Sequence, residues 1–198
     1  MFQKNRLAGL RFSGRSFTLV PPMKISPWVL APLFLAMFSF AQADPLRVGD
    51  AAPAVSGTTE TGGTLNLGDV YKQQTYTLVY FYPRAGTSGC TKQGDSLRDA
   101  YDQLMKKGVA VVGVSTDTVA AQLKFKQEQN FPFPLIADQN EVVIKAFGVP
   151  TRTIPTMGPL ASRQAYLIKD GKIVWCDYKA STSTQAQDVL KVLAGFGS

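Results

Sequence analysis

The chain has 198 residues, a formal net charge of +7, two cysteines and no histidine. This length allows one ordinary domain with a full hydrophobic core. The absence of histidine excludes Ser-His and Cys-His catalysis and removes the commonest metal ligand, so we expect no metal site. Two cysteines do not make a disulfide framework for a domain of this size.

The basic excess lies in residues 1–43, which contain five basic residues and no acidic one. The remainder holds 16 basic and 14 acidic residues, without a basic stripe. A nucleic-acid partner is therefore not expected.

Residues 1–43 have the features of a cleavable export signal. From Met23, where translation could start instead, the chain has a lysine, an apolar run from Trp28 to Phe40, and Ala41-Gln42-Ala43 in the small-x-small cleavage pattern. The apolar run is shorter than the ~20 residues that span a bilayer as a helix. We expect an exported mature protein of residues 44–198, periplasmic in a bacterium and without stable membrane insertion. An uncleaved anchor and an organellar transit peptide are the alternatives.

Strand and helix patterns alternate along residues 44–198. Expected strands cover 76–82, 109–115 and 135–138, after a short hairpin over 55–67. Expected helices run from near Cys90 to about 107, over 119–129 with Asp117 or Thr118 as N-cap, over 141–147 and over 184–193. Residues 150–162 read as a loop, and Asp170-Gly171 predicts a hairpin between strands 163–169 and 172–178. The pattern predicts a single three-layer α/β domain with a central mixed sheet flanked by helices.

Cys90 lies where a buried strand, a turn and a helix meet. The residues that share one face of this helix are Leu97, Tyr101, Leu104 and Met105. The first turn of a helix favours an anion, and hence the nucleophilic thiolate. The neighbours of Cys90 are small or polar, which argues against burial: Thr87, Ser88, Gly89, Thr91 and Lys92. The alternative is a buried structural cysteine.

These residues resemble the signature of the peroxiredoxins, and specifically of their bacterioferritin-comigratory or Q-type branch. The match around the peroxidatic cysteine is Pro83-x-x-x-Thr87-x-x-Cys90. Further matches follow in order over residues 46–195: Val114-Ser115-Thr116-Asp117, Phe131-Pro132-Phe133-Pro134-Leu135 with Asp138, Phe147-Gly148-Val149, Arg163, and Asp170-Gly171-Lys172-Ile173. The resemblance implies a thioredoxin-like fold and a cofactor-free antioxidant peroxidase that reduces hydrogen peroxide and organic hydroperoxides.

The resemblance also implies roles for individual residues. Cys90 would attack the peroxide and become a sulfenic acid. Thr87 Oγ1 would hydrogen-bond the thiolate and the peroxide, and Arg163 would stabilise the thiolate and hold the peroxide. Backbone N–H groups of Gly89 and Cys90 would stabilise developing charge, and Pro83 would shield the sulfur. The alternatives are a helix cap for Thr87, a solvated strand-edge cation for Arg163 and a turn residue for Pro83.

Three positions depart from the family pattern. Asp95 stands where many members carry a resolving cysteine, so a disulfide within this helix is impossible. Gln93 replaces a common glutamate, which alters the charges around Arg163, and Ser88 replaces a usual proline.

The second cysteine, Cys176, lies in a predicted strand where alternation places it on one face with Val174 and Tyr178. It is either a half-buried strand thiol or a resolving partner that acts after local unfolding or between molecules. We expect the former, and therefore a one-cysteine enzyme. A thioredoxin-like protein or a small thiol would then reduce the sulfenic acid. The branch resemblance implies a monomer or weak dimer.

Two other functions stay open. Thiol-disulfide exchange occurs on a similar fold, but Cys90-Thr91-Lys92-Gln93 lacks the second thiol of a Cys-x-x-Cys motif. A non-catalytic binding module could keep the fold alone. Peroxide consumption that depends on Cys90 distinguishes the peroxidase from both.

Overall fold

The structure is a computed structural model that describes residues 44–196. The predicted export segment 1–43 lies outside the described residues. Within 44–196, none of the helices combines the length and the apolarity that a membrane crossing requires.

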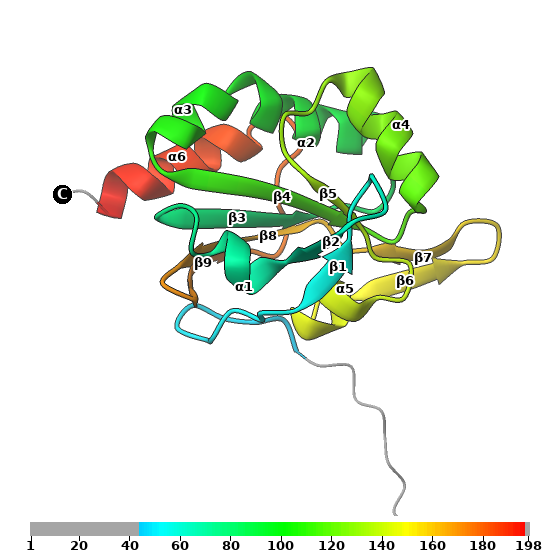
Figure 1. Ribbon diagram of the computed structural model, residues 1–198, viewed down its shortest axis with the longest axis horizontal. Coiled ribbons are helices and arrows are strands. Elements are labelled where there is room, and N and C mark those ends of the chain that lie inside the picture. The colour runs from blue at the N-terminus through cyan, green and yellow to red at the C-terminus, as the bar shows by residue number, and fades with distance from the viewer. Residues whose placement is uncertain (1–43, 197–198) are drawn as a thin grey trace, which may run out of the picture. The chain divides into compact units, whose positions relative to one another are not determined.

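A five-stranded mixed sheet forms the middle layer, with the order β5-β4-β3-β8-β9 (Figure 1). Its strands are β3 (Tyr76–Phe81), β4 (Val109–Ser115), β5 (Leu135–Ala137), β8 (Gln164–Lys169) and β9 (Lys172–Asp177). Strand β4 pairs in parallel with β3 and β5, whereas β8 pairs antiparallel with β3 and β9. Nearly every residue of β3, β4 and β5 is buried, because helices and hairpins cover both faces.

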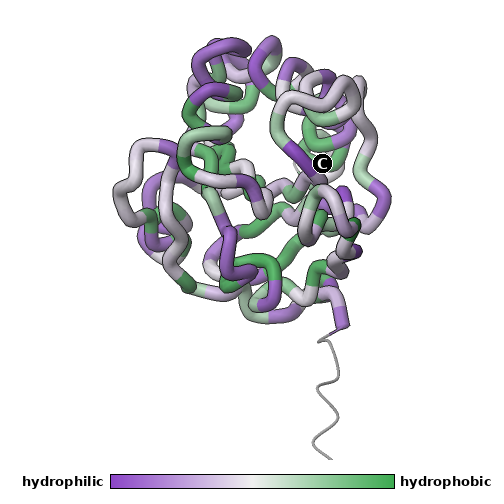
Figure 2. Tube along the Cα trace, turned by 90° about the vertical axis from the view of Figure 1, so that its right-hand side faces the viewer, coloured by the Kyte–Doolittle hydropathy of each residue, from purple (hydrophilic) through white to green (hydrophobic). Residues whose placement is uncertain are grey.

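The outer layers confirm the predicted three-layer α/β domain. Above the sheet in Figure 1 lie α2 (Ser88–Asp99), α3 (Tyr101–Lys106), α4 (Val119–Gln129) and α6 (Gln185–Phe196). Below it lie α1 (Leu67–Val70), α5 (Val142–Ala146) and two hairpins, β1 (Ser56–Thr58) with β2 (Thr64–Asn66), and β6 (Thr151–Ile154) with β7 (Gly158–Ala161). Hydrophobic segments run through the interior in Figure 2, whereas hydrophilic ones lie mostly at its rim.

Two apolar clusters pack against the two faces of the sheet. The first core, on the side of α2, α3, α4 and α6, includes Leu78, Tyr80 and Tyr82 of the central segment. The second core, on the side of α1 and α5, includes Val79 and Phe81. Successive residues of β3 thus enter opposite cores, as the period of two in a strand requires.

Two predictions about the chain's elements were wrong. The expected loop 150–162 contains the β6–β7 hairpin, in which Thr153 pairs with Pro159. Proline weakens a strand pattern, but it is tolerated where the strand has a free edge, as in a two-stranded sheet. The helix expected to run to residue 107 is interrupted at Ala100, whose φ of −98° and ψ of 9° separate α2 from α3.

Both edges of the sheet are contacted by the chain's first described segment. At the β5 edge, Thr59 forms a bridge with Ile136. At the β9 edge, Ala51 forms a bridge with Lys172. The residues before β3 therefore bond to both outer strands.

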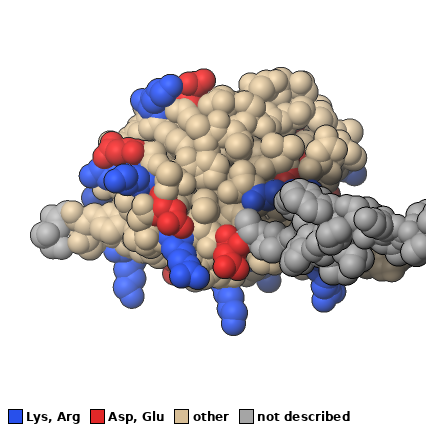
Figure 3. Space-filling view, turned by 90° about the horizontal axis from the view of Figure 1, so that it is seen from below, with Lys and Arg blue, Asp and Glu red and all other residues tan. Residues whose placement is uncertain are grey.

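Charges of both signs occur on the face shown in Figure 3. Lys and Arg side chains lie beside Asp and Glu there, over the part not covered by grey atoms. This mixed distribution agrees with the nearly balanced charge of residues 44–198.

Candidate active site

Cys90 lies in the first turn of α2, directly after the loop that follows β3. Thr87 is the N-cap residue, with an extended backbone (φ −80°, ψ 147°). The N–H of Thr91 donates to the Thr87 carbonyl at 2.8 Å, which starts the helical hydrogen bonds. The preceding N–H groups, those of Gly89 and Cys90 among them, are the ones that a helix leaves without intrahelical acceptors. They are suited to the predicted role of charge-stabilising donors.

Strand pairing brings Arg163 to the sulfur. Gln164 of β8 pairs with Phe81 of β3, so the residue before β8 lies beside the loop that follows β3. The Nη2 of Arg163 donates to Cys90 Sγ at 3.3 Å. A side chain at Gly89 would place its Cβ 3.3 Å from the same Nη2, so glycine leaves room for the guanidinium.

Two buried glutamines, Gln93 and Gln185, extend the hydrogen bonding from Arg163. Arg163 Nη1 donates to Gln93 Oε1, and Gln93 Nε2 donates to Gln185 Oε1 at 2.8 Å. Both glutamine side chains are fully buried. The sequence singled out Gln93 as a departure from the family, but it did not point to Gln185, which is the first residue of α6 and follows a run of Ser and Thr without a recognisable motif.

The expectation that Cys90 escapes burial was wrong. Its side chain is 1% exposed and belongs to the first core. Helical spacing explains this, because residues three, four and seven positions later share its face. Those residues are Gln93, Gly94 and Leu97, and all are buried. The polar sequence neighbours point elsewhere, since adjacent residues on a helix differ by about 100° in direction.

Thr87 and Pro83 lie in the loop, but neither bonds to the Cys90 sulfur. Thr87 Oγ1 donates its proton to the Arg84 carbonyl at 3.0 Å and makes no capping bond. The expected hydrogen bond from Thr87 to Cys90 is therefore absent from this arrangement. Pro83 is half-buried immediately after Tyr82, the last residue of the apolar run. Their catalytic roles stay predictions.

The phenol of Tyr80 is an additional buried group close enough to interact with the site. Its hydroxyl has no hydrogen-bond partner among the described residues. Burial raises the pKa of Tyr80 far above its usual value, the charge of Cys90 raises it further, and Arg163 opposes this in part. Tyr80 therefore stays a neutral phenol at physiological pH.

A β-bulge determines where Cys176 points. Leu167 pairs with Trp175 but Ile168 pairs with Ile173, which leaves Val174 as the extra residue. Val174 and Trp175 pack against the first core, whereas Cys176 packs against the second. The predicted shared face of Cys176 and Val174 was therefore wrong.

The expected proximity of Cys176 to Tyr178 is present: the interaction with the Cys176 thiol raises the pKa of the Tyr178 phenol, whose hydroxyl donates to the Leu46 carbonyl at 2.9 Å. Both cysteines are free thiols. Since Cys90 belongs to the first core and Cys176 packs against the second, the sheet separates them.

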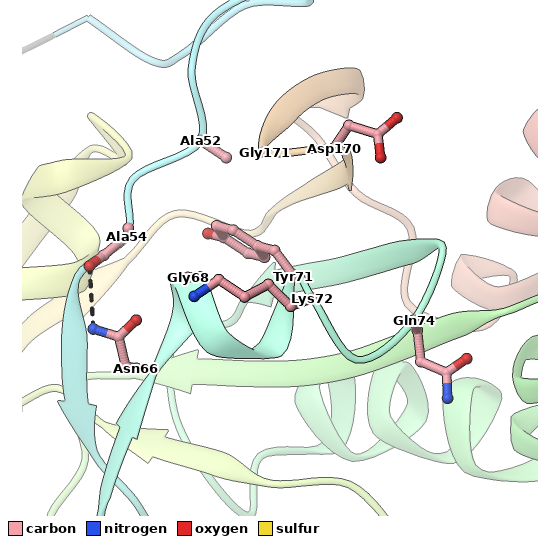
Figure 4. Close-up of a pocket in the computed structure, with 9 residues that line it drawn as sticks. All are labelled: Ala52, Ala54, Asn66, Gly68, Tyr71, Lys72, Gln74, Asp170 and Gly171. Atoms are coloured by element: carbon pink, nitrogen blue, oxygen red, sulfur yellow. Dashed lines mark hydrogen bonds between the residues drawn. The ribbon is translucent and has the colours of Figure 1, made fainter.

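A pocket of about 690 Å³ lies away from Cys90. Figure 4 shows its lining, which includes Tyr71, Lys72 and Asp170. Tyr76 at the start of β3 pairs with Lys169, next to the hairpin turn that lines this pocket, whereas Arg163 lies beyond the other end of β3. At 3.3 Å per residue the two ends of β3 are roughly 17 Å apart. The pocket is therefore separate from the site around Cys90.

Within residues 44–196, Cys, Asp and Glu side chains form no group of three or more that could hold a metal ion.

Comparisons with known proteins give a consistent family. The AhpC/TSA family model matches residues 48–176. The chain is similar to peroxiredoxin Bcp of Escherichia coli strain K12, with 42% identity over 106 residues that cover 54% of this chain and 67% of that protein.

Two solved structures have the same fold over nearly their whole length. Peroxidoxin BcpB from Mycobacterium tuberculosis aligns with a TM-score of 0.70 and 28% identity, covering 76% of this chain and 97% of that one. A mutant of PrxQ from Xylella fastidiosa aligns with a TM-score of 0.71 and 25% identity, covering 79% and 100%. These matches confirm the predicted thioredoxin-like fold, and the chain belongs to the AhpC/TSA family as a Bcp/Q-type peroxiredoxin, an enzyme that reduces peroxides with electrons from thiols.

Proposed function

We propose that Cys90 is the peroxidatic cysteine of this enzyme and that Arg163 is its catalytic cation. The observation that carries the proposal is the 3.3 Å contact from Arg163 Nη2 to Cys90 Sγ. A guanidinium is always charged and has donors only, so at this distance it favours the thiolate over the neutral thiol. The unpaired N–H groups of the first turn of α2 add to this stabilisation.

The proposed reaction transfers two electrons from sulfur to the peroxide. The thiolate attacks one peroxide oxygen, an S–O bond forms and the O–O bond breaks. The departing alkoxide takes a proton and leaves as an alcohol, or as water when the substrate is hydrogen peroxide. Cys90 is then a sulfenic acid. Donors from Arg163 and from the N–H groups of Gly89 and Cys90 act on the oxygen where charge develops.

An external thiol completes the cycle in this proposal. Its sulfur attacks the sulfenic acid, so that a mixed disulfide forms and water leaves. A second thiol then attacks that disulfide and releases Cys90 reduced. The packing of Cys90 and Cys176 against opposite cores supports this one-cysteine cycle, because an internal disulfide requires their sulfurs to meet. A thioredoxin-like protein and a low-molecular-weight thiol are the two reductants of suitable chemistry.

Intact-mass analysis after one equivalent of peroxide tests this function. Wild type and Cys176→Ser should each gain about 16 Da as sulfenic acid, or form an adduct with an added thiol. Cys90→Ser should neither gain this mass nor consume peroxide. A loss of about 2 Da in the wild type that disappears in Cys176→Ser would instead reveal an internal disulfide.

The proposal includes export directed by residues 1–43. It rests on the basic start, the apolar run and Ala41-Gln42-Ala43. After expression of the full chain in a bacterium, the periplasmic fraction should contain a protein whose N-terminal residue is Asp44. Recovery of the uncleaved chain from the cytoplasm alone would contradict export, and recovery of that chain from membranes would favour an anchor.

A further inference from the structure

The side chain of Arg163 bonds to the Cys90 sulfur and to a neutral amide, and not to a carboxylate. Among the ion pairs of residues 44–196, none involves Arg163. One of its terminal nitrogens donates to Cys90 Sγ and the other to the amide oxygen of Gln93. No acidic partner therefore competes with the thiolate for the charge of this guanidinium.

The direction of each hydrogen bond in this group is determined by the arginine. A guanidinium has no acceptor, so Gln93 has to present its oxygen to Arg163 and its NH₂ group to the other side. That NH₂ donates to Gln185 Oε1 at 2.8 Å. The NH₂ of Gln185 is then left buried without a partner among the described residues.

An unpartnered buried donor is costly, and native structures keep few of them. Gln185 nevertheless presents its oxygen to Gln93. A second bond fixes this end of α6 against α2, because the N–H of Ala186 donates to Ser96 Oγ at 3.1 Å. In this arrangement the NH₂ of Gln93 has an acceptor in Gln185 Oε1, whereas the NH₂ of Gln185 stays unpaired among the described residues.

We propose that Gln185 is a positioning residue of the active site, which acts through Gln93 to hold Arg163 against Cys90. The two neutral amides orient the guanidinium without neutralising it. Gln185 touches neither the sulfur nor the peroxide in this scheme. The inference rests on the proposed function of Cys90 and Arg163.

The first test compares Gln185→Met with Gln187→Met. Both changes are in α6, but Gln187 is exposed, and its Oε1 accepts a long hydrogen bond from Ser96 Oγ at 3.5 Å, whereas Gln93 bonds to Gln185. Gln185→Met should lower the second-order rate constant for peroxide about tenfold, less than the ~100-fold that a 1 Å misplacement of reacting groups can cost. It should also move the pH midpoint of Cys90 alkylation upward, because a loosened arginine stabilises the thiolate less. Gln187→Met should change neither quantity, and wild-type values in Gln185→Met would overturn the proposal.

A double variant tests whether Gln185 acts through Gln93. Gln93→Met with Gln185→Met should be no slower than Gln93→Met alone, since the acceptor at 185 has nothing left to orient. If the rate losses of the two single variants multiply in the double variant, the two residues act independently, and the proposal that Gln185 acts through Gln93 is overturned. Circular dichroism checks that each variant is folded. Gln185→Asn, which is too short to reach Gln93, replaces Gln185→Met if that variant does not fold.

The variant Gln93→Glu tests whether the group that orients Arg163 has to be a neutral amide. A carboxylate at this position should pair with Arg163 and move the alkylation midpoint to higher pH, whereas an unchanged midpoint would contradict the role assigned to the neutral amides. Alkylation needs no peroxide, so it reports on the positioning of Arg163 separately from peroxide turnover. A wild type whose Cys90 is alkylated but which consumes no peroxide would refute the proposed function, while the positioning role of Gln185 would still be testable by alkylation.

Discussion

The carboxylate of Asp117 accepts the backbone N–H of Ala85 at 2.7 Å, which ties the end of β4 to the loop before Cys90. The same carboxylate oxygen accepts the hydroxyl of Ser115 at 2.7 Å. Ser115 in turn accepts from Gln122 Nε2 at 2.7 Å, and Gln122 Oε1 accepts from the Tyr82 hydroxyl. Each donor in this series of hydrogen bonds has an acceptor. The series links Tyr82 to Ala85, the two ends of the turn that contains Pro83.

Replacement of Asp117 should therefore disturb the loop. In Asp117→Ala the Ser115 hydroxyl and the Ala85 N–H lose their acceptor, which should lower the free energy of unfolding by about 2 kcal/mol. The displaced loop should lower the rate constant for peroxide about tenfold. Stopped-flow peroxidase assays and urea unfolding measure the two effects. Asp117→Asn keeps an acceptor oxygen and should retain most of both quantities, so equal losses in the two variants would contradict this account.

Removal of the cation should affect activity far more than stability. Arg163→Met should lower the rate constant for peroxide about 100-fold or more, the size of effect seen when one charge-stabilising donor is lost. Arg163→Lys keeps the charge but not the two-pronged donor geometry, so we expect an intermediate rate. The measurement is the second-order rate constant, with thermal unfolding as the control. A fully active Arg163→Met would remove Arg163 from the mechanism.

Glu60 should contribute stability that depends on pH. Its buried carboxylate accepts from Lys126 Nζ at 2.6 Å and from the N–H of Leu135 at 2.9 Å. Burial raises the pKa of Glu60, but these hydrogen bonds outweigh it, so the pKa lies below its usual value. A carboxyl with a lowered folded-state pKa stabilises the fold above its unfolded pKa of about 4.3, and this contribution is lost as pH falls through the folded pKa.

In Glu60→Gln the free energy of unfolding should therefore depend less on pH between about pH 3 and 7 than in wild type. At pH 7 the free energy of unfolding of the variant should be lower than that of wild type by about 2 kcal/mol, the size of a hydrogen bond to a charged group. This difference should shrink below about pH 4. Urea unfolding between pH 3 and 7 measures it. A difference that is constant over this range would contradict the linkage.

Gly94 should not tolerate a methyl group. A Cβ at this position would lie 2.3 Å from Cζ of Phe131, a buried ring that packs between Phe125 and Phe133. Overpacking costs about 1–3 kcal/mol, whereas alanine gains about 1 kcal/mol over glycine in a helix. Because these rings have little room to move, we expect the clash to win.

Gly195→Ala in α6 is the matched control. No described residue lies within 4 Å of a Cβ built at Gly195, so the gain in helix propensity should dominate and stabilise the fold by about 0.5 kcal/mol. Thermal unfolding of the two variants should therefore give shifts of opposite sign. A stabilised Gly94→Ala would contradict the packing argument.

The sequence predicted the elements whose signals are local and unambiguous. The strand Val109–Ser115 and the helix Val119–Gln129 have the expected bounds, and Thr118 is the N-cap that accepts from the N–H of Ala121. The Asp170-Gly171 turn joins β8 and β9 as expected, with φ of 51° and 71°. Apolar periodicity, capping chemistry and turn residues agree at these positions, which is why they could be predicted.

The rest depends on contacts between distant segments. No local pattern shows that Val174 bulges, because the register of β9 is set by β8 and by packing on both cores. Gln185 lies 92 residues from Gln93, and its amide gives no motif to find. The burial of Cys90 follows from helical spacing, but it becomes evident only once Phe131 and the first core are in place.

The bridges at both margins of the sheet bear on how the protein can self-associate. A bare outer strand invites pairing with a strand from another molecule. Here Glu60 N–H donates to the Leu135 carbonyl at 2.9 Å, and at the opposite margin Gly49 N–H donates to the Ile173 carbonyl at 2.8 Å. The stretch of β9 beyond these bonds contains the bulge at Val174, which makes it a poor template for strand addition. Any dimer of this domain should therefore form through side-chain surfaces and leave the backbone ladder as it is.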